Sequence, residues 1–197
     1  MFDRKIILEN ERVMIVPFSL EYKDELKEII FDSSIWTYMG LTIQTDEDFD
    51  TYITSTLQEK HNQKSYPFII IDKMTNKVAG STRFGNIHLF NKRLEIGWTW
   101  YGSEYQGTGL NHACKYELLK FAFEELGFNR VQFSADIENH RSQKAILKLG
   151  AKQEGIFRSN YIDENGNARD DVYFSIVANE WEKVKKQSFK FRESTKI

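Results

Sequence analysis

The stretch around which this chain is organised is Trp98-Thr-Trp-Tyr-Gly-Ser-Glu-Tyr-Gln-Gly-Thr-Gly-Leu-Asn-His-Ala-Cys-Lys115. It predicts a strand, a glycine turn and then an amphipathic helix. Gly107 and Gly109 can adopt backbone angles closed to other residues and leave amide groups uncovered, so residues 106–111 could present several N–H donors to an anion. The partial positive charge at the start of the helix favours the same ligand. Many such turns merely connect a strand to a helix, so the surrounding sequence has to decide.

Composition narrows the classes of function. A chain of 197 residues fits one domain, and 28% charged residues with a net charge of -2 give no general attraction to nucleic acid or an anionic membrane. Cys114 is the only cysteine, which excludes an internal disulfide and a cysteine metal cluster, and its place on an apolar helical stripe favours a core role. No run of 18 apolar residues occurs. We therefore expect a cytoplasmic protein.

Local patterns before the turn predict a strand, two helices and three more strands. Ser19 is the expected N-cap of the first helix, and Thr45 with Asp48 predicts a capping box for the second. The expected strands are 13–18, 66–72, 77–84 and 93–101, and the expected helices are 20–30 and 46–59. The connection 33–40 contains Trp36 and Tyr38, which either anchor the loop to the core or form a wall for a substrate.

Strand 93–101 is expected to alternate along its whole length. Leu94, Ile96, Trp98 and Trp100 would share one face, and Glu95, Gly97, Thr99 and Tyr101 the other. Glu95 is the odd residue in an otherwise apolar or small set.

After the turn, the pattern continues as helix, strand, helix and hairpin. An apolar helical stripe follows Leu110 and ends near Gly127, and Asn139 is the expected cap of a second helix. The expected elements are the helix 110–127, the strand 131–137, the helix 140–149 and the hairpin 151–161 with 170–177. The last residues, from Glu182, carry six lysines or arginines against two glutamates, and we expect a short helix that frays.

Both this element order and three spaced motifs resemble the GNAT acyltransferase superfamily. Residues 106–111, Gln-Gly-Thr-Gly-Leu-Asn, match its acyl-CoA motif Gln/Arg-x-x-Gly-x-Gly/Ala except that Asn111 replaces the final small residue. Asn139-His-Arg-Ser142, followed by Leu149-Gly-Ala and Glu154-Gly, resembles the signature of RimJ/RimL-type N-acetyltransferases. The closing 169–176, Arg-Asp-Asp-Val-Tyr-Phe-Ser-Ile, followed by Glu180-Trp181, fits that branch. The resemblance covers about residues 10–182.

The resemblance implies a fold class and a co-substrate. The expected fold is a single mixed α/β domain (α+β mixed), with a mostly antiparallel twisted sheet of about seven strands flanked by about four helices. It would occupy residues 1–182, and residues 183–197 would form a basic C-terminal tail. Acetyl-CoA would be the co-substrate, with its pantetheine arm between strands 93–101 and 131–137, and no metal is expected.

The resemblance also assigns roles to individual residues. It implies Glu95 and Ser142 as catalytic residues, and Trp36 and Tyr38 are the candidates for the substrate wall. The residues expected to bind the cofactor are Trp98, Gln106, Gly107, Thr108, Gly109, Leu110, Asn111 and Asn139.

The chemistry sets two requirements for direct attack of an amine on the thioester. The amine must be neutral: with reference pKa values of about 8 for an α-amine and 10.4 for lysine, roughly a tenth of the former but under a thousandth of the latter is neutral at pH 7. Glu95 is the candidate base, directly or through water, or else it is a solvated or cross-strand-paired glutamate. The carbonyl oxygen needs a backbone donor, which a bulge near Gly97 or Trp98 would supply.

Two residues near the second motif have alternative roles. Ser142 either contacts the departing thiol or simply sits in the first turn of a helix. Asn139 either contacts CoA or caps that helix, and its amide group could do both.

We expect the acceptor to be a protein N-terminus, or else a small-molecule amine, with no nucleic acid or membrane partner, in a monomer or homodimer. It is the resemblance to the family that implies this acceptor. An alternative is a non-catalytic acyl-CoA-binding sensor. A phosphate-binding NTPase is a weaker reading because the Gly-Lys-Ser/Thr of a P-loop is missing.

Overall fold

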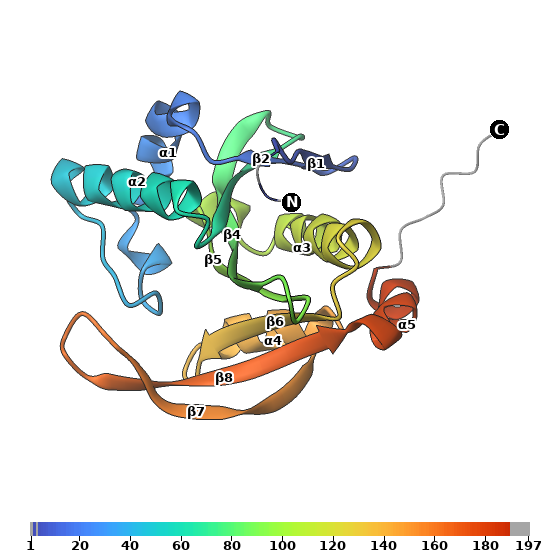
Figure 1. Ribbon diagram of the computed structural model, residues 1–197. Helices are drawn as coiled ribbons and strands as arrows, with labels where there is room; N and C mark the ends of the chain where they lie inside the picture. Colours follow the sequence, from blue (N-terminus) through green and yellow to red (C-terminus); the bar gives the residue numbers. More distant parts are fainter. Residues whose placement is uncertain (1, 3, 190–197) are drawn as a thin grey trace.

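The computed structural model describes residue 2 and residues 4–189 (Figure 1). Eight strands form one sheet in the order β1-β2-β3-β4-β5-β6-β8-β7. The strands are β1 Leu8–Glu9, β2 Val13–Pro17, β3 Tyr66–Asp72, β4 Lys77–His88, β5 Arg93–Tyr101, β6 Arg130–Asp136, β7 Lys152–Ile162 and β8 Ala168–Val177. The α-helices are α1 Lys23–Ile30, α2 Asp46–His61, α3 Leu110–Lys120, α4 His140–Lys148 and α5 Ala178–Ser188.

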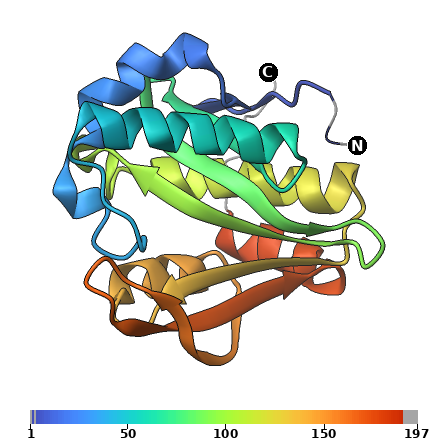
Figure 2. The same cartoon turned by 60° about the vertical axis from the view of Figure 1, so that its left-hand side comes forward.

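The pairing of β5 with β6 divides the sheet into two arms. It is parallel, whereas the other pairs of the described sheet are antiparallel. It consists of only Arg93 with Arg130, Leu94 with Val131 and Glu95 with Gln132. Beyond Glu95 the strands part, and Figure 2 shows the arm β1–β5 diverging from the arm β6–β8–β7. The parallel connection needs a crossover, which α3 supplies.

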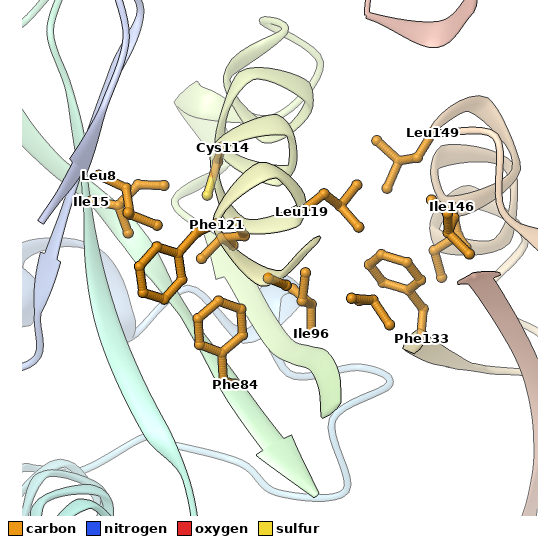
Figure 3. Packing of buried hydrophobic residues seen from close by; sticks show 14 of the residues in the cluster. Leu8, Ile15, Phe84, Ile96, Cys114, Leu119, Phe121, Phe133, Ile146 and Leu149 are labelled. Atoms are coloured by element: carbon orange, nitrogen blue, oxygen red, sulfur yellow. The ribbon is translucent and has the colours of Figure 1, made fainter. Parts of the chain in front are cut away.

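Two apolar cores cover opposite faces of the sheet. Helices α1 and α2 cover one face, and the α2 core there includes Phe18, Leu26, Ile30, Trp36, Phe49, Ile53 and Trp100. Helices α3 and α4 cover the other face, and the α3 core there includes Phe84, Ile96, Cys114, Leu119, Phe133, Ile146 and Leu149 (Figure 3). Because α3 packs on β5 and α4 packs on β6, this second core spans the point where the strands part. The predicted core role of Cys114 is confirmed.

The mixed fold is confirmed, with eight strands where about seven were expected. The additional strand is β1, whose two residues are too short to show an alternating pattern. The capping box of Thr45 and Asp48 is confirmed, as is the cap of Asn139, whose Oδ1 accepts from the N–H of Ser142 at 3.0 Å. Ser19 is a correction: it precedes a 3₁₀ turn before α1, and its side chain makes no capping hydrogen bond.

The C-terminal helix belongs to the packed fold. Trp181 of α5 stacks on Phe123 at a ring-centroid distance of 5.3 Å, and Val184 and Phe189 are also buried in the α3 core. The expected boundary between residues 182 and 183 falls inside α5, and the division into domain and tail stays a prediction. Residues 190–197 lie outside the described part of the chain. None of the described helices is both long and apolar enough to cross a membrane.

Asp136, at the end of β6, ties the long β7–β8 hairpin to the rest of the sheet. Its buried carboxylate accepts hydrogen bonds from Tyr161 Oη at 2.7 Å and from Arg169 Nε and Nη2 at 3.1 and 3.0 Å. Burial alone would raise the pKa of Asp136, but the Arg169, Tyr161 and Glu138 N–H hydrogen bonds together hold it below its usual 3.8. Arg169 also contacts Glu138, which is exposed.

Asp136→Asn should destabilise the protein by about 3 kcal/mol at pH 7, because it breaks a buried ion pair and leaves Arg169 with a weaker partner. Urea unfolding of wild type and variant measures the loss. Glu138→Gln removes the exposed partner of the same arginine and should cost less than about 1 kcal/mol. Equal losses in the two variants would refute a special role for Asp136.

The stability of the protein should fall at acidic pH because of Asp136. Because folding lowers the pKa of Asp136, its contribution to stability is present above pH 3.8 and is lost as the pH falls through the folded-state pKa. Asp136→Asn should remove this part of the acid sensitivity.

Candidate active site

A β-bulge at Trp98 shapes the middle of β5. Ser81 pairs with Trp100 and Arg83 pairs with Gly97, so three steps on β5 oppose two steps on β4. Trp98 takes up the additional residue with φ of +49°, a left-handed angle that is unusual for a bulky side chain. A bulge near Gly97 or Trp98, which a backbone donor for the carbonyl oxygen would require, is therefore present.

The bulge overturns the expected alternation of this strand. Leu94 and Ile96 lie in the α3 core as expected, but Trp100 lies in the α2 core and Tyr101 in the α3 core. One inserted residue moves every later side chain to the other face. The pattern of apolar residues in the sequence does not reveal this reversal, because both faces of the strand carry apolar residues.

The Trp98 ring rests directly on β4. A Cβ at Gly85 would lie 2.3 Å from Cζ3 of the ring, so only glycine leaves room for it there. The Arg83 guanidinium lies 5.5 Å from the ring centroid, within the range of a cation–π contact. Trp98 remains 39% exposed, so the ring is held by the strand while part of it faces outward.

Glu95 lies at the point where β5 and β6 part. Its carboxylate is buried and accepts from Asn86 Nδ2 at 2.8 Å, Gln132 Nε2 at 2.8 Å and Ser134 Oγ at 2.9 Å. All three donors are uncharged. Since a carboxylate offers about four acceptor sites, one site stays free for a further proton or hydrogen bond. Glu95 is thus buried and paired across the strands rather than solvated, and its free acceptor site also suits a base.

Further polar groups of β8 lie on the Glu95 side of the sheet. Ser134 pairs with Tyr173, and directly paired residues present their side chains to the same face. Asp171 follows at a spacing of two, and Asn160 Nδ2 donates to it at 2.8 Å. Burial, the largest cause, raises the pKa of Asp171, and the charges of Asp136 and Glu95 add to it. Asp136 pairs directly with Asp171, so this face carries three carboxylates, those of Glu95, Asp136 and Asp171.

The glycine turn has the open geometry of an anion site. Gly107 and Gly109 have φ of +76° and +87°, and a Cβ at either would meet no atom within 4 Å. Among the described residues, the backbone N–H groups of Gly107, Thr108 and Gly109 donate to no protein acceptor. At the start of α3, the N–H of Leu110 donates to Thr108 Oγ1 at 3.4 Å, whereas the N–H groups of Asn111 and His112 have no helical partner in the described part of the chain. These donors suit a phosphate group.

Gln106 and Arg141 join the turn to α4. Gln106 Nε2 donates to the carbonyl of Tyr101 at 3.1 Å, and its Oε1 accepts from Arg141 Nη1. The exposed guanidinium of Arg141 thus lies beside the turn. The same first turn of α4 holds Asn139 and the half-buried Ser142, so the two predicted motifs meet in space.

Asn111, the residue that departs from the family motif, has an unusual environment. Its Oδ1 is buried and accepts no hydrogen bond from the described protein atoms. A buried acceptor without a donor costs free energy, which a ligand N–H or a water could recover. The turn and this acceptor are therefore compatible with a ligand that carries both phosphate oxygens and amide groups.

The two aromatic residues of the 33–40 connection lie in different places. Trp36 is 1% exposed, and its Nε1 donates to the carbonyl of Ile30 at 2.8 Å, so it anchors the loop and cannot form a substrate wall. Tyr38 is 37% exposed and lines a cavity of about 220 Å³ against the β7–β8 hairpin. The other cavity residues include Gly40, Glu138, Tyr161, Asp163 and Arg169.

Comparison with known proteins fits this arrangement of split sheet, bulge and open turn. Residues 12–152 match the family model described as "Acetyltransferase (GNAT) domain". The chain belongs to the GNAT acetyltransferase family. The fold agrees: a GCN5-related N-acetyltransferase from Brucella melitensis superimposes with a TM-score of 0.86 at 25% identity, over 94% of this chain and 85% of that one.

Relatives of this GNAT chain include bacterial N-acetyltransferases. It is 29% identical to the uncharacterized N-acetyltransferase p20 of Bacillus licheniformis over 88% of this chain and 97% of that protein. It is 35% identical to "Putative ribosomal N-acetyltransferase YdaF" of Bacillus subtilis over 53% of this chain, and the match spans only 56% of YdaF. RimL, a ribosomal L7/L12 alpha-N-protein acetyltransferase, shares the fold with a TM-score of 0.77 at 15% identity, covering 88% of this chain and 94% of RimL. The family predicted from the motifs is confirmed.

Several residues of this GNAT site escaped the sequence analysis. Asn86, Gln132 and Ser134 hold Glu95, and Arg141 adjoins the turn. Gln132, Ser134 and Arg141 have partners 35 to 39 residues away in the sequence, and Asn86, although only nine residues from Glu95, is brought to it by the pairing of β4 with β5. Of these four residues, Arg141 could have been predicted most readily, since it lies inside the Asn139–Ser142 motif.

Proposed function

We propose that this GNAT protein transfers an acetyl group from acetyl-CoA to a primary amine by direct attack, and that a protein N-terminal α-amine is the favoured acceptor. The parting of β5 from β6 carries this proposal. Beyond Glu95, the edge of β5 that faced β6 has no partner strand among the described elements. The amide groups of a pantetheine arm could pair with such an edge as an added strand does.

The pyrophosphate of acetyl-CoA would then lie at the glycine turn. The open amides of residues 107–109 follow β5 directly, and with the start of α3 they would hold the pyrophosphate. Arg141 would add a charged donor on the α4 side. Gln106, Leu110, Asn111 and Asn139 complete the proposed cofactor site, with Trp98 at the thioester end.

The reaction itself needs few protein groups. The amine nitrogen attacks the thioester carbon and forms the C–N bond, which gives a tetrahedral intermediate with its negative charge on the former carbonyl oxygen. When this intermediate collapses, the C=O bond is restored and the C–S bond breaks, with its electron pair going to sulfur. Glu95 would take the proton from the nitrogen, directly or through water, and a backbone N–H at the Trp98 bulge would stabilise the carbonyl oxygen. The CoA thiolate leaves and is protonated, with Ser142 as a proposed hydrogen-bond donor.

The acceptor would enter the site from the side of the β7–β8 hairpin. Tyr38 lines the cavity of about 220 Å³ between the 33–40 connection and the hairpin, which is the proposed entry for the acceptor. YdaF is named a putative ribosomal N-acetyltransferase, and RimL is named a ribosomal L7/L12 alpha-N-protein acetyltransferase, which supports a protein N-terminus as the acceptor. A small-molecule amine is the second candidate.

An acceptor screen tests the function directly. Peptides with free N-termini, N-terminally blocked lysine peptides, polyamines and amino-sugars are each incubated with acetyl-CoA, and CoA release and product mass are measured. We expect acetylation of peptide N-termini. Stabilisation by acetyl-CoA without transfer to any acceptor would instead favour the sensor alternative.

Glu95→Gln should lower kcat/KM at pH 7 by about 10²-fold or more, because the amine loses its base. The substitution is well matched to the site: a glutamine Oε1 can accept from Asn86 and Gln132, and its amide can donate to the Ser134 hydroxyl. The loss should shrink as the pH rises toward the pKa of the acceptor amine.

The control for this variant is Glu28→Gln, which removes an exposed carboxylate of α1. Its kcat/KM and melting temperature should equal those of wild type. A Glu95→Gln enzyme with wild-type kcat/KM across the pH range would show that Glu95 is only a structural link.

Arg141→Gln should weaken acetyl-CoA binding by about tenfold or more, because a charged hydrogen bond to phosphate is lost. Calorimetric titration at low and high salt measures the affinity, and the salt dependence should also decrease. Lys144→Gln removes an exposed cation one turn further along α4 and should leave the affinity unchanged. Unchanged binding in Arg141→Gln would place the phosphates elsewhere.

A further inference from the structure

Lys115 of α3 is a buried lysine without an acidic partner. It is 5% exposed, and among the described residues no carboxylate forms an ion pair with it. Its Nζ instead donates to Thr99 Oγ1 at 2.6 Å and to Thr82 Oγ1 at 3.2 Å. Burial lowers the pKa of Lys115 to about 8. Lysines are almost never this buried unless they are paired, so the position needs an explanation other than stability.

The lysine determines where the two threonine hydroxyls direct their protons. An ammonium group only donates, so both hydroxyl oxygens must accept from it. Their own protons are then directed to the remaining acceptors: Thr82 and Thr99 lie 2.7 Å apart, and both face the carbonyl of Gly97, at 3.4 and 3.3 Å. The network therefore ends on the peptide group that joins Gly97 to Trp98.

That peptide group is the start of the bulge. A tryptophan at φ of +49° is held in a costly conformation, which persists only when its surroundings enforce it. On one side, the indole packs on Gly85 and Arg83. On the other side, the hydroxyl pair holds the Gly97 carbonyl, and Lys115 holds the hydroxyls.

We propose that Lys115 is a positioning residue that acts through Thr99 and Thr82 to keep the Trp98 bulge in the conformation used for catalysis. The inference rests on the proposed function, in which a backbone N–H at this bulge stabilises the developing oxyanion. A small rotation of the Gly97–Trp98 peptide would misalign that donor, and misplacement on the scale of about 1 Å can cost about 10²-fold in rate. The buried ammonium of Lys115 lowers the stability of the fold but keeps the Gly97–Trp98 peptide aligned.

Lys115→Met is the principal test. We expect kcat to fall by at least about tenfold, while KM for acetyl-CoA changes by less than about threefold, because the aligned donor matters in the transition state. The melting temperature should equal or exceed that of wild type, because the variant no longer buries an unpaired charge. Lys120→Met, in the same helix but partly exposed, should retain wild-type kcat and KM.

A second pair of variants tests the route through Thr99. Thr99→Val removes the hydroxyl with little change of shape and should lower kcat as Lys115→Met does, whereas Thr99→Ser should restore most of it. The double variant Lys115→Met/Thr99→Val should be no slower than either single variant, because both remove one shared interaction. Multiplicative losses would overturn this route. If Lys115→Met does not fold, the Thr99 pair decides the question.

A structural measurement separates this inference from the proposed function. In ¹H–¹⁵N spectra, Lys115→Met should shift the backbone amide signals of Gly97, Trp98 and Thr99, and Lys120→Met should leave them in place. If wild type acetylates nothing in the screen, the proposed function fails, while these spectra still test the hold of Lys115 on the bulge. Unshifted signals, or an active Lys115→Met enzyme with wild-type kcat, would overturn the inference.

Discussion

The separation of β5 from β6 is the constraint on which the rest of this structure depends. If β5 and β6 were paired along their whole length, the backbone groups on this edge of β5 would all be hydrogen-bonded to β6. Here pairing lasts for three residues and stops at Glu95, whose carboxylate still links the arms through Gln132 and Ser134. The α3 core then spans both arms from one face (Figure 3). The sheet is thus held together behind the gap while the edge of β5 stays open.

Two buried charged groups lie on opposite sides of β5 and do not neutralise one another. Glu95 faces the arm β6–β8 and is held by three uncharged donors, whereas Lys115 lies beneath the strand and is held by two hydroxyls. An ion pair between Glu95 and Lys115 would satisfy both groups but would also neutralise their charges. Hydrogen bonds with neutral groups satisfy each charged group without neutralising it.

The parts of this molecule that could be predicted are those with local causes. The capping box of Thr45, the cap of Asn139 and the limits of β3 and β5 follow from neighbouring residues, and the structure has them as expected. The faces of β5 beyond Trp98 were predicted wrongly, because a bulge depends on the register with β4. Trp36 was ambiguous for a similar reason: an aromatic residue in a loop has the same sequence whether it faces the core or a cleft, and the contacts of α2 and β5 place it in the core.

The order of the main elements, the family and the glycine turn could be inferred from the chain alone, because periodicity, capping and the spacing of motifs are short-range properties. The groups around Glu95, the cation beside the turn and the contacts of Lys115 became known from the folded structure. Asn86, Gln132 and Ser134 come from two other strands, and Arg141 comes from a separate helix. These residues come together through the strand register and the packing of α3 and α4 across the split. Neither can be predicted from a short stretch of sequence.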